Sequence, residues 1–474
     1  MLALFGIIVL DQEDKMKGLV ILGVYLVVMM IIAAVSSKKI TSVKQFNVSD
    51  RNVGKTVSAL SIAATWIWAP ALFTSAEKAY TSGVDGLFWF LVPNVLCLMI
   101  FAPFAAYMRK QFPEGMTISG YMADKYKSGR VKNIYLVQTA GLSVLSTAVQ
   151  LLAGGKVLAI MTGLPFTVVV LILAVIGLIC AAFSGIKGSI MTDAVQFILI
   201  AGAAIGLLAG VMSVNGTGSI AAGLGGISGK FGNLFDENGK DVFIGFGLSS
   251  AIGLLSGPFG DQAFWQRAFS VKSKSVKPAF IIGALLFAIV PLTIGLIGFS
   301  AAGAGYQTAD TGNLTFRYIA DTLPSWTLIP LVLMLLSGLL STVDSCMCSI
   351  SSLSTDVFKG NDIGIGKVCM VIALAFAVAI AHIPGLTVTH LFLFYGTLRA
   401  STMLPTVMTL KGMKLSEKGV FFGVLLSMCV GLPVFAYGNL FNVNAFKVIG
   451  SLAALLISGL VALVSSKRTE VSRI

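Results

Sequence analysis

Long apolar segments follow one another along almost the entire chain of 474 residues. Each has about 20 residues, the length of helix that crosses a hydrocarbon layer roughly 30 Å thick. Because that layer holds no water, each segment must satisfy its backbone hydrogen bonds internally, as an α-helix. Only 11% of the residues are charged, too few to cover a soluble protein of this size. We therefore expect an all-α polytopic membrane protein surrounded by membrane lipid.

The apolar segments predict about thirteen transmembrane helices. They lie at 17–36, 56–76, 86–108, 133–160, 165–184, 189–212, 242–266, 278–303, 325–352, 368–384, 387–410, 419–437 and 445–466. The first ten residues are apolar but too short to span a membrane, and we assign no function to residues 1–15.

Lysine and arginine are concentrated in every second loop between these spans. The basic loops lie at 37–55, 109–132, 267–277 and 411–418, and the tail after residue 466 is also basic. Loops with this bias stay in the cytoplasm. We therefore expect the amino terminus outside and the carboxyl terminus inside, in a plasma membrane (the inner membrane of a bacterium). The same bias explains the net charge of +13, so we expect no nucleic-acid partner, and no obligatory protein partner is indicated.

The chain offers little material for a metal or catalytic centre. All six cysteines fall inside apolar segments, without the loop spacing of a zinc site or a disulfide framework. The two histidines, His382 and His390, have no acidic residue near them in the sequence. The sequence therefore predicts a protein that is not an enzyme.

Two of the spans contain sequences that interrupt a helix. In 63–70, Pro70 removes a backbone donor and disfavours helical conformation at Ala69, which frees carbonyl groups one turn earlier. In 253–262, a Gly-Pro pair lies between further glycines. Transporters place ion and substrate sites at such breaks, and an interval of five spans is expected of an inverted repeat. The paired breaks predict an occluded site near the middle of the membrane.

The ninth span carries the oxygen atoms that a hard cation requires. Ser341 and Ser345 are one helical turn apart, and Thr342 lies beside them. The alternative is that these hydroxyl groups donate hydrogen bonds to their own helix. Asp344, in the same span, favours the functional interpretation, because a carboxylate inside a membrane is costly. Asp193, near the end of the sixth span, is a second carboxylate of this kind, unless that end is solvated.

Four stretches together carry a family resemblance. They are DRNVGKTVSALSIAATWIWAPALF (50–73), FSGIKGSIMTDAVQFILI (183–200), GDQAFWQRAF (260–269) and LSGLLSTVDSCMCSISSLSTDVF (336–358). The chain resembles the sodium:solute symporter family. The resemblance implies a LeuT-type fold: an extra helix at 17–36, inverted repeats of five helices at 56–212 and 242–410, and two carboxyl-terminal helices at 419–466.

The resemblance also implies a coupling ion, Na⁺, and the residues that bind it. The main sodium site matches the backbone of Ala64, Ile67 and Gly338 and the hydroxyl groups of Ser341 and Thr342. A second site, for a cation or a proton, matches Asp193, Asp344 and Ser345. At the position of Asp344, family members with a second sodium usually carry serine.

The solute is expected beside the sodium, between the two helix breaks. The expected side chains are Trp66, Trp68, Phe90, Ser146, Gln150, Phe259, Gln262, Tyr395 and Arg399. Aromatic walls with a few polar groups suit a small polar molecule. Phe90 and Leu254 stand where sugar carriers have polar residues, which disfavours a sugar, and the motifs look most like the urea-transporting branch. If Lys156 or Arg399 faced a carboxylate of the solute, an amino acid or organic acid would be favoured instead. The alternative is that these long side chains extend to the membrane interface and do not contact the solute.

The predicted function is therefore secondary active transport. We expect sodium-coupled symport of a small polar organic solute by alternating access, with urea first and an amino acid or organic acid next. The alternatives are a proton-coupled symporter of the same fold and a solute channel.

Overall fold

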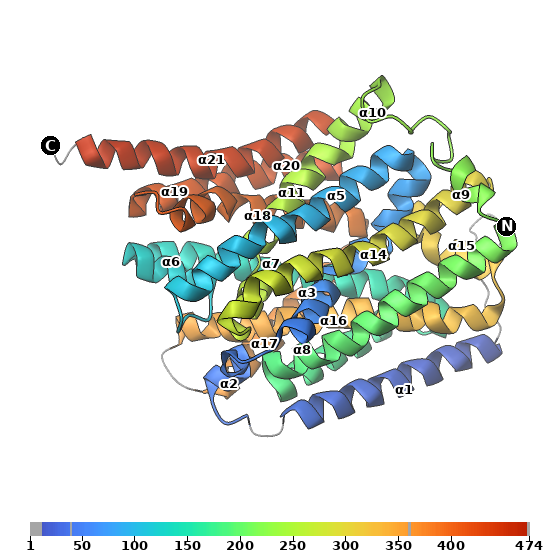
Figure 1. The fold of residues 1–474 in the computed structure, drawn as a ribbon, viewed down its shortest axis with the longest axis horizontal. Helices are drawn as coiled ribbons and strands as arrows, with labels where there is room; N and C mark the ends of the chain where they lie inside the picture. The colour runs from blue at the N-terminus through green and yellow to red at the C-terminus, as the bar shows by residue number, and fades with distance from the viewer. Residues whose placement is uncertain (1–11, 38–39, 359–361, 472–474) are drawn as a thin grey trace.

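The computed structural model describes residues 12–37, 40–358 and 362–471, and these residues form helices without any β-strand. The apolar segment at 1–10 lies outside the described residues. The long helices lie side by side along a common direction (Figure 1). They are α1 (Gln12–Ser37), α5 (Thr74–Gln111), α7 (Gly129–Thr162), α8 (Phe166–Asn215), α14 (Val276–Gly303), α16 (Leu328–Val357), α17 (Ile363–Ala381), α18 (Val388–Leu410) and α21 (Asn444–Val471). The all-α prediction is confirmed.

The predicted number of spans is not confirmed. Among the described residues, eight helical stretches are long and apolar enough to cross a membrane. The two counts differ for three reasons. The spans 165–184 and 189–212 are joined in α8, and 56–76 and 242–266 are each divided into short helices. The helices at 17–36 (α1) and 387–410 (α18) are not among the eight. The span at 419–437 corresponds to α19 (Glu417–Leu426) and α20 (Leu432–Leu440), which a π-helical turn joins.

Helix α8 is divided by a glycine that no other residue could replace without strain. As a straight helix its 50 residues would extend about 75 Å, more than twice the thickness of a hydrocarbon layer. At Gly185 the backbone has φ 54° and ψ −159°, which is outside the range that L-residues normally adopt. A β-carbon there would lie 2.5 Å from the Phe46 carbonyl oxygen of α2 (Val43–Val48). The bend therefore lets α2 pack directly against α8.

Short helices mark the two ends of the bundle (Figure 1). Helices α2 and α6 (Ile118–Tyr126) lie at one end, called the α6 end below. Helices α9 (Gly218–Ala222), α10 (Glu237–Val242) and α15 (Leu314–Thr322) lie at the other, the α15 end. Helix α1 starts at the α15 end and α21 finishes at the α6 end. The helices of segments 37–55 and 109–132, which the charge pattern places on the same side of the membrane, thus lie at the same end of the bundle. That this α6 end faces the cytoplasm stays a prediction.

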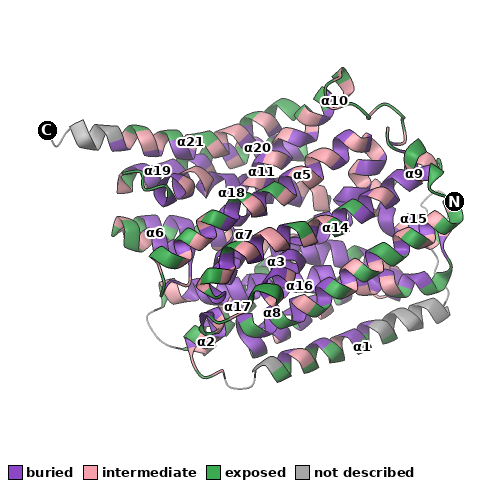
Figure 2. Cartoon of the chain, in the orientation of Figure 1, coloured by how far each residue is buried: buried purple, intermediate pink, exposed green. Residues whose placement is uncertain are grey.

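The distribution of apolar residues is that of a protein in lipid. Figure 2 shows a buried interior around α16 and exposed positions along the outer helices. Large apolar side chains are exposed on those faces, among them Ile31 of α1, Ile198 of α8 and Phe376 of α17. A soluble protein rarely exposes so much contiguous apolar surface, so these faces contact the hydrocarbon of the membrane.

Candidate functional site

The first predicted break is present in the structure. Helix α3 (Lys55–Trp66) ends where Ile67 adopts φ −83° and ψ 76°, and Trp68 is extended. Helix α4 (Ala69–Leu72) then restarts with Pro70 in its first turn, where proline loses no hydrogen bond. The side-chain oxygen of Gln150 accepts a hydrogen bond from the Ala69 amide at 2.8 Å. Gln150 therefore supports the break from the neighbouring α7.

The second predicted break lies between α11 (Leu248–Leu255) and α13 (Gln262–Ser270). The four-residue helix α12 (Gly257–Gly260) separates them, and Asp261 is extended with φ −108° and ψ 117°. The Asp261 Oδ1 atom accepts a hydrogen bond from the Ala263 amide at 3.0 Å and so begins α13. A β-carbon on Gly257 would lie 2.4 Å from the ring of Trp66. The glycine therefore lets the two breaks approach each other.

The residues predicted to bind sodium lie where α16 passes the first break. A β-carbon on Gly338 would lie 3.2 Å from the Ile67 carbonyl oxygen, so α16 contacts the unwound backbone directly. Thr342 Oγ1 donates a hydrogen bond to the Gly338 carbonyl at 3.1 Å, as the alternative interpretation of these hydroxyl groups expects. Ser341 Oγ instead donates to Asp193 at 2.6 Å. Its partner therefore comes from another helix.

Asp193 forms a buried ion pair that was not predicted. The Arg267 Nη2 atom lies 2.8 Å from Asp193 Oδ2, and both side chains are almost completely buried. The same nitrogen donates to Ser345 Oγ at 2.6 Å. The carboxylate also accepts hydrogen bonds from the hydroxyl groups of Ser61 and Thr65, at 2.6 and 3.3 Å. Asp193 is therefore not at a solvated helix end.

Arg267 corrects two of the sequence expectations. The charge pattern assigned it to a basic loop, but it belongs to α13 and is 1% exposed. Its guanidinium also lies between two members of the predicted second ion site, Asp193 and Ser345. Asp344, the third member, accepts a hydrogen bond from Ser345 Oγ at 3.3 Å. The three residues therefore lie close together, and the Arg267 guanidinium lies between Asp193 and Ser345.

Five of the nine residues predicted to bind solute surround one small cavity of about 10 Å³. These five are Trp66, Trp68, Ser146, Tyr395 and Arg399. The other lining residues are Thr65, Asp261, Ala263, Phe264, Thr342 and Cys346. A volume of this size holds at most about one water molecule, so the side chains are closed around the site. Thr342 belongs both to this cavity and to the predicted sodium site, so the two sites are adjacent.

A second buried ion pair forms one wall of the cavity. Arg399 Nη2 lies 3.1 Å from Asp261 Oδ2, and Tyr395 Oη donates to the same oxygen at 2.6 Å. Arg399 also donates a hydrogen bond to Tyr395. Its guanidinium carbon lies 4.9 and 5.5 Å from the ring centres of Trp66 and Trp68. The aromatic rings therefore hold the cation in place by cation–π contacts.

Several donors around the cavity have no hydrogen-bond partner. They are Nε and Nη1 of Arg399 and the indole nitrogen of Trp68, all buried. Buried donors normally have partners, and each exception calls for an explanation. A solute with an acceptor oxygen would satisfy them, while Asp261 could accept hydrogen bonds from the N–H groups of the same solute.

The other four predicted residues lie away from the cavity. Phe90 lies one aromatic ring further out, 6.0 Å from Phe392, and Gln150 supports α4 as described. Phe259 packs edge-on against Phe101 at 5.2 Å. Gln262 is hydrogen-bonded to Ile118 of α6 and to Met116, so it faces the α6 end, although its neighbours Ala263 and Phe264 line the cavity. Asp261 and Arg267 belong to one of the four family motifs, but the sequence does not predict a role for either of them. Their partners lie on other helices.

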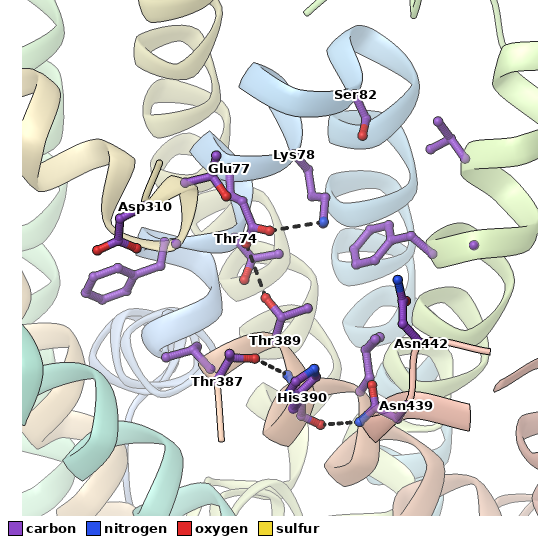
Figure 3. Close-up of a pocket in the computed structure, with 18 of the residues that line it drawn as sticks. Thr74, Glu77, Lys78, Ser82, Asp310, Thr387, Thr389, His390, Asn439 and Asn442 are labelled. Carbon is purple, nitrogen blue, oxygen red and sulfur yellow. Dashed lines mark hydrogen bonds and ion pairs between the residues drawn. The ribbon is translucent and has the colours of Figure 1, made fainter. Parts of the chain in front are cut away.

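A wide vestibule opens at the α15 end (Figure 3). It has a volume of about 780 Å³ and lies between α5, α10, α18 and the loop at 309–313. Thr389 of α18 donates a hydrogen bond to Glu77 of α5 at 3.2 Å across it (Figure 3). Lys156 also lines the vestibule and is exposed, so it snorkels and does not reach the closed cavity. Phe73 and Leu393 line the vestibule, and each lies within five residues of a residue that lines the closed cavity, Trp68 and Tyr395 respectively.

The α6 end is sealed below the cavity by side-chain to backbone hydrogen bonds. Gln262 accepts from the Ile118 amide at 3.1 Å and donates to the Met116 carbonyl at 2.8 Å and to Ser352 at 3.0 Å. Nearby, Asp356 accepts from the hydroxyl group of Thr117 at 2.7 Å. The cavity therefore has a wide vestibule on one side and hydrogen-bonded side chains on the other, and a separate hollow of about 450 Å³ lies at the α6 end between 40–57 and 187–191.

The fold and site can now be compared with known proteins. The sequence model of the sodium:solute symporter family matches residues 46–427. The chain belongs to the sodium:solute symporter family. The resemblance noted from the four motifs is thus confirmed, and members of this family carry solutes across membranes.

Curated relatives of this chain include several urea transporters. Probable urea active transporter 1 of Schizosaccharomyces pombe is 25% identical over 315 residues, which cover 61% of this chain and 46% of that protein. The urea-proton symporter DUR3 of Oryza sativa subsp. japonica is 23% identical over 482 residues, covering 88% and 65%. The sodium/pantothenate symporter of Escherichia coli is 25% identical over 291 residues, covering 58% of each protein. The chain therefore spans less than two thirds of the length of these relatives.

Solved structures confirm the fold of this chain. A Na⁺-coupled sialic acid symporter in a substrate-bound, outward-open state aligns with a TM-score of 0.78 at 18% identity, over 94% of this chain and 97% of that chain. Mhp1, a nucleobase-cation-symport-1 family transporter in a closed conformation, aligns with a TM-score of 0.58 at 14% identity, over 89% and 95%. The LeuT-type fold is thus shown.

Proposed function

We propose that this symporter couples the inward movement of sodium to that of a small polar organic solute, with urea as the first candidate. The observation that carries the proposal is the contact between the unwound Ile67 backbone and the hydroxyl-bearing turn of α16 that starts at Gly338. A cation site needs oxygen atoms with free lone pairs, and this contact brings backbone and hydroxyl oxygens together.

The hydrogen bonds at this turn favour cation binding. A hydroxyl group has one hydrogen and two lone pairs. Ser341 gives its hydrogen to Asp193 and Thr342 gives its hydrogen to the Gly338 carbonyl. The remaining lone pairs of both hydroxyl groups can then bind an ion without a proton in the way. The carbonyl oxygens of Ala64, Ile67 and Gly338 complete the proposed set of ligands.

The polar groups of the cavity favour a neutral amide as the solute. Urea has one carbonyl acceptor and four N–H donors. We expect its oxygen to accept from Arg399 and the indole of Trp68, and its N–H groups to donate to Asp261 and Ser146. An amino acid or organic acid is the second candidate. It is less favoured because Asp261 already neutralises Arg399 at 3.1 Å, so a carboxylate would meet a negative charge.

Proton coupling is the main competing proposal. It is supported by the relative in Oryza sativa, which is called a urea-proton symporter. A solute channel is less favoured, because the wide vestibule and the sealed α6 end suit a carrier that opens to one side at a time. The limits of the two repeats, the location in a plasma membrane with the amino terminus outside, and the second ion site at Asp193, Asp344 and Ser345 remain part of the proposal.

Uptake into proteoliposomes tests the proposed function. We would measure labelled urea, proline, pantothenate and small carboxylates under a sodium gradient and, separately, under a proton gradient. We expect sodium-driven uptake of urea. The variants Ser341→Ala and Thr342→Val should raise the half-saturating sodium concentration by about tenfold, which corresponds to a loss of about 1.4 kcal/mol. Ser354→Ala, which removes a buried hydroxyl group nearer the carboxyl-terminal end of α16, is the matched control. Urea uptake driven by protons alone would contradict sodium coupling.

A further inference from the structure

Asp344 is a buried carboxyl group that forms no ion pair with any basic side chain in the described part of the chain. It is 3% exposed and lies on α16, which packs against α8 and α1. Its described partners are hydroxyl groups: Ser189 at 3.0 Å and Ser345 at 3.3 Å from Oδ1, and Thr192 at 3.3 Å from Oδ2. None of the ion pairs among residues 12–37, 40–358 and 362–471 includes Asp344. A carboxyl group in such a place needs either a compensating cation or a proton.

Arg267 does not supply that charge fully, because it is engaged elsewhere. Its Nη2 atom bridges Asp193 at 2.8 Å and Ser345 at 2.6 Å. The remaining guanidinium nitrogens donate to Ser61 and to the Ala263 carbonyl. The guanidinium therefore pairs with Asp193 and forms no ion pair with Asp344. A cation that balances Asp344 would have to bind apart from Arg267.

A small cavity lies beside Asp344, between α16, α8 and α1, and neither Arg267 nor Asp193 lines it. It has a volume of about 10 Å³, and Asp344, Thr192 and Gln196 line it. The other lining residues are Met29, Ile176, Gly177, Cys180 and Leu340. Thr192 and Gln196 are one helical turn apart on α8, so they face α16 together. The cavity thus combines one carboxylate with two polar side chains in an otherwise apolar wall.

The oxygen atoms around this cavity have unused lone pairs. Gln196 is 2% exposed, and its Oε1 atom has no hydrogen-bond partner. Its Nε2 atom donates to Tyr25 Oη of α1 at 2.8 Å, which holds the amide in place. Thr192 has one hydroxyl hydrogen but three acceptors nearby: the carbonyls of Gly188 and Ser189, both at 3.0 Å, and Asp344 at 3.3 Å. Two of these three acceptors must lack that hydrogen.

We infer that a sodium ion binds in this cavity, with Asp344 Oδ2, Gln196 Oε1 and Thr192 Oγ1 as ligands. Hard cations prefer oxygen ligands that include a carboxylate, and the ion would satisfy the unpartnered oxygen and the unbalanced charge together. Tyr25 is a positioning residue, which gives the extra helix α1 a part in ion binding. This site differs from the predicted site of Asp193, Asp344 and Ser345, because there the Arg267 guanidinium lies between Asp193 and Ser345. The inference rests on the proposed sodium coupling.

Direct sodium binding to the purified symporter tests the inference. We would measure the number of ²²Na⁺ ions bound per chain, and the Hill coefficient of sodium for urea uptake in proteoliposomes. Asp344→Asn and Gln196→Leu should each remove one sodium ion per chain and lower the Hill coefficient toward one. Tyr25→Phe should still bind the ion, but the sodium affinity of this site should fall by about tenfold, the usual effect of losing a hydrogen bond to a metal ligand. Ser184→Ala, which removes another buried hydroxyl group of α8, is the matched control and should change neither value.

The outcomes separate this inference from the proposed function. If the unmodified chain binds no sodium and proton-driven uptake remains, the proposed sodium coupling fails and this inference fails with it. If the unmodified chain binds sodium but Gln196→Leu and Asp344→Asn bind the same number of ions, this inference alone is overturned. Gln196→Leu keeps the test decisive even if Asp344→Asn does not fold, because it leaves the buried charges unchanged.

Discussion

Arg267 of α13 and Asp193 of α8 form an ion pair at 2.8 Å, with both side chains almost completely buried. Asp193 also accepts the hydroxyl hydrogen of Ser341, one of the proposed sodium ligands, at 2.6 Å. The pair thus connects the second helix break with the sodium-site helix α16. Movement of α13 during transport would change the orientation of a sodium ligand.

Removing one partner of this pair should destabilise the fold strongly. Arg267→Gln leaves the Asp193 carboxylate buried without its cation, and breaking a buried pair in this way costs about 3–5 kcal/mol. We expect a large drop in melting temperature in detergent and loss of uptake. The double variant Arg267→Gln/Asp193→Asn should recover part of the stability, because no unpaired charge remains.

The matched control is the exposed pair of Lys127 and Asp124, whose side chains are 79% and 59% exposed. Lys127→Gln should change stability by less than about 1 kcal/mol. An Arg267→Gln protein as stable as this control would contradict the importance of the buried pair.

Replacement of Arg399 by lysine should weaken solute binding without preventing sodium binding. Lysine keeps the charge, but it cannot reproduce the planar set of donors that faces both Asp261 and the cavity. Losing a hydrogen bond to a charged group costs about 1.5–3 kcal/mol, so we expect the apparent solute affinity to fall by about 10–100-fold. Tyr395→Phe, which removes one hydrogen bond to Asp261, should have a smaller effect.

Uptake kinetics and sodium binding, measured on the same preparations, check this prediction. Lys156→Gln serves as the control, because Lys156 lines the vestibule and not the cavity. An Arg399→Lys protein with unchanged solute affinity would mean that the cavity is not the solute site.

Gln262→Leu should loosen the seal at the α6 end. The change leaves the Ile118 amide and the Met116 carbonyl without their side-chain partner, at a cost of about 1–3 kcal/mol to the closed arrangement. We expect faster hydrogen exchange of the Ile118 amide, measured by mass spectrometry of the peptide that contains it. Gln307→Leu, an exposed position at the α15 end, should leave that exchange unchanged. Equal exchange in both variants would show that Gln262 does not hold this end closed.

Glu114 should contribute stability only while it is ionised. The hydrogen bond from Lys44, at 3.1 Å, and the charge of Arg51 lower the pKa of its carboxyl group. Because the pKa is lower in the folded protein, the contribution is present above the ordinary value of about 4.3. It is lost as the pH falls through the lowered folded value. The melting temperature of the native chain should therefore exceed that of Glu114→Gln at pH 7, and the difference should shrink on acidification.

High salt provides a second check on the Glu114 prediction, since the side chain is 76% exposed. At about 1 M salt, screening acts within about 3 Å, and most of the difference should disappear. A difference that is independent of both pH and salt would indicate a cause other than the ion pair.

The amino-acid sequence by itself determined the membrane environment, the helical class and the two helix breaks. These depend on local properties: the length of apolar segments, the missing donor of Pro70 and the flexibility of glycine at Gly257. The four motifs together also identified the family, and the motif around Ser341 and Thr342 indicated the helix expected to bind sodium. Each of these features lies within a short stretch of chain.

Only the tertiary structure decided which charges are paired and which side chains face the cavity. Arg267 and Asp193 are 74 residues apart, and Arg399 and Asp261 are 138 apart. Their pairing depends on how α8, α13 and α18 pack and rotate, which no local pattern specifies. For the same reason Phe259 and Gln262, next to the second break in sequence, lie away from the cavity, whereas Asp261 between them lines it. Packing around α16 also left Asp344 without a positive partner, from which we infer the additional ion site.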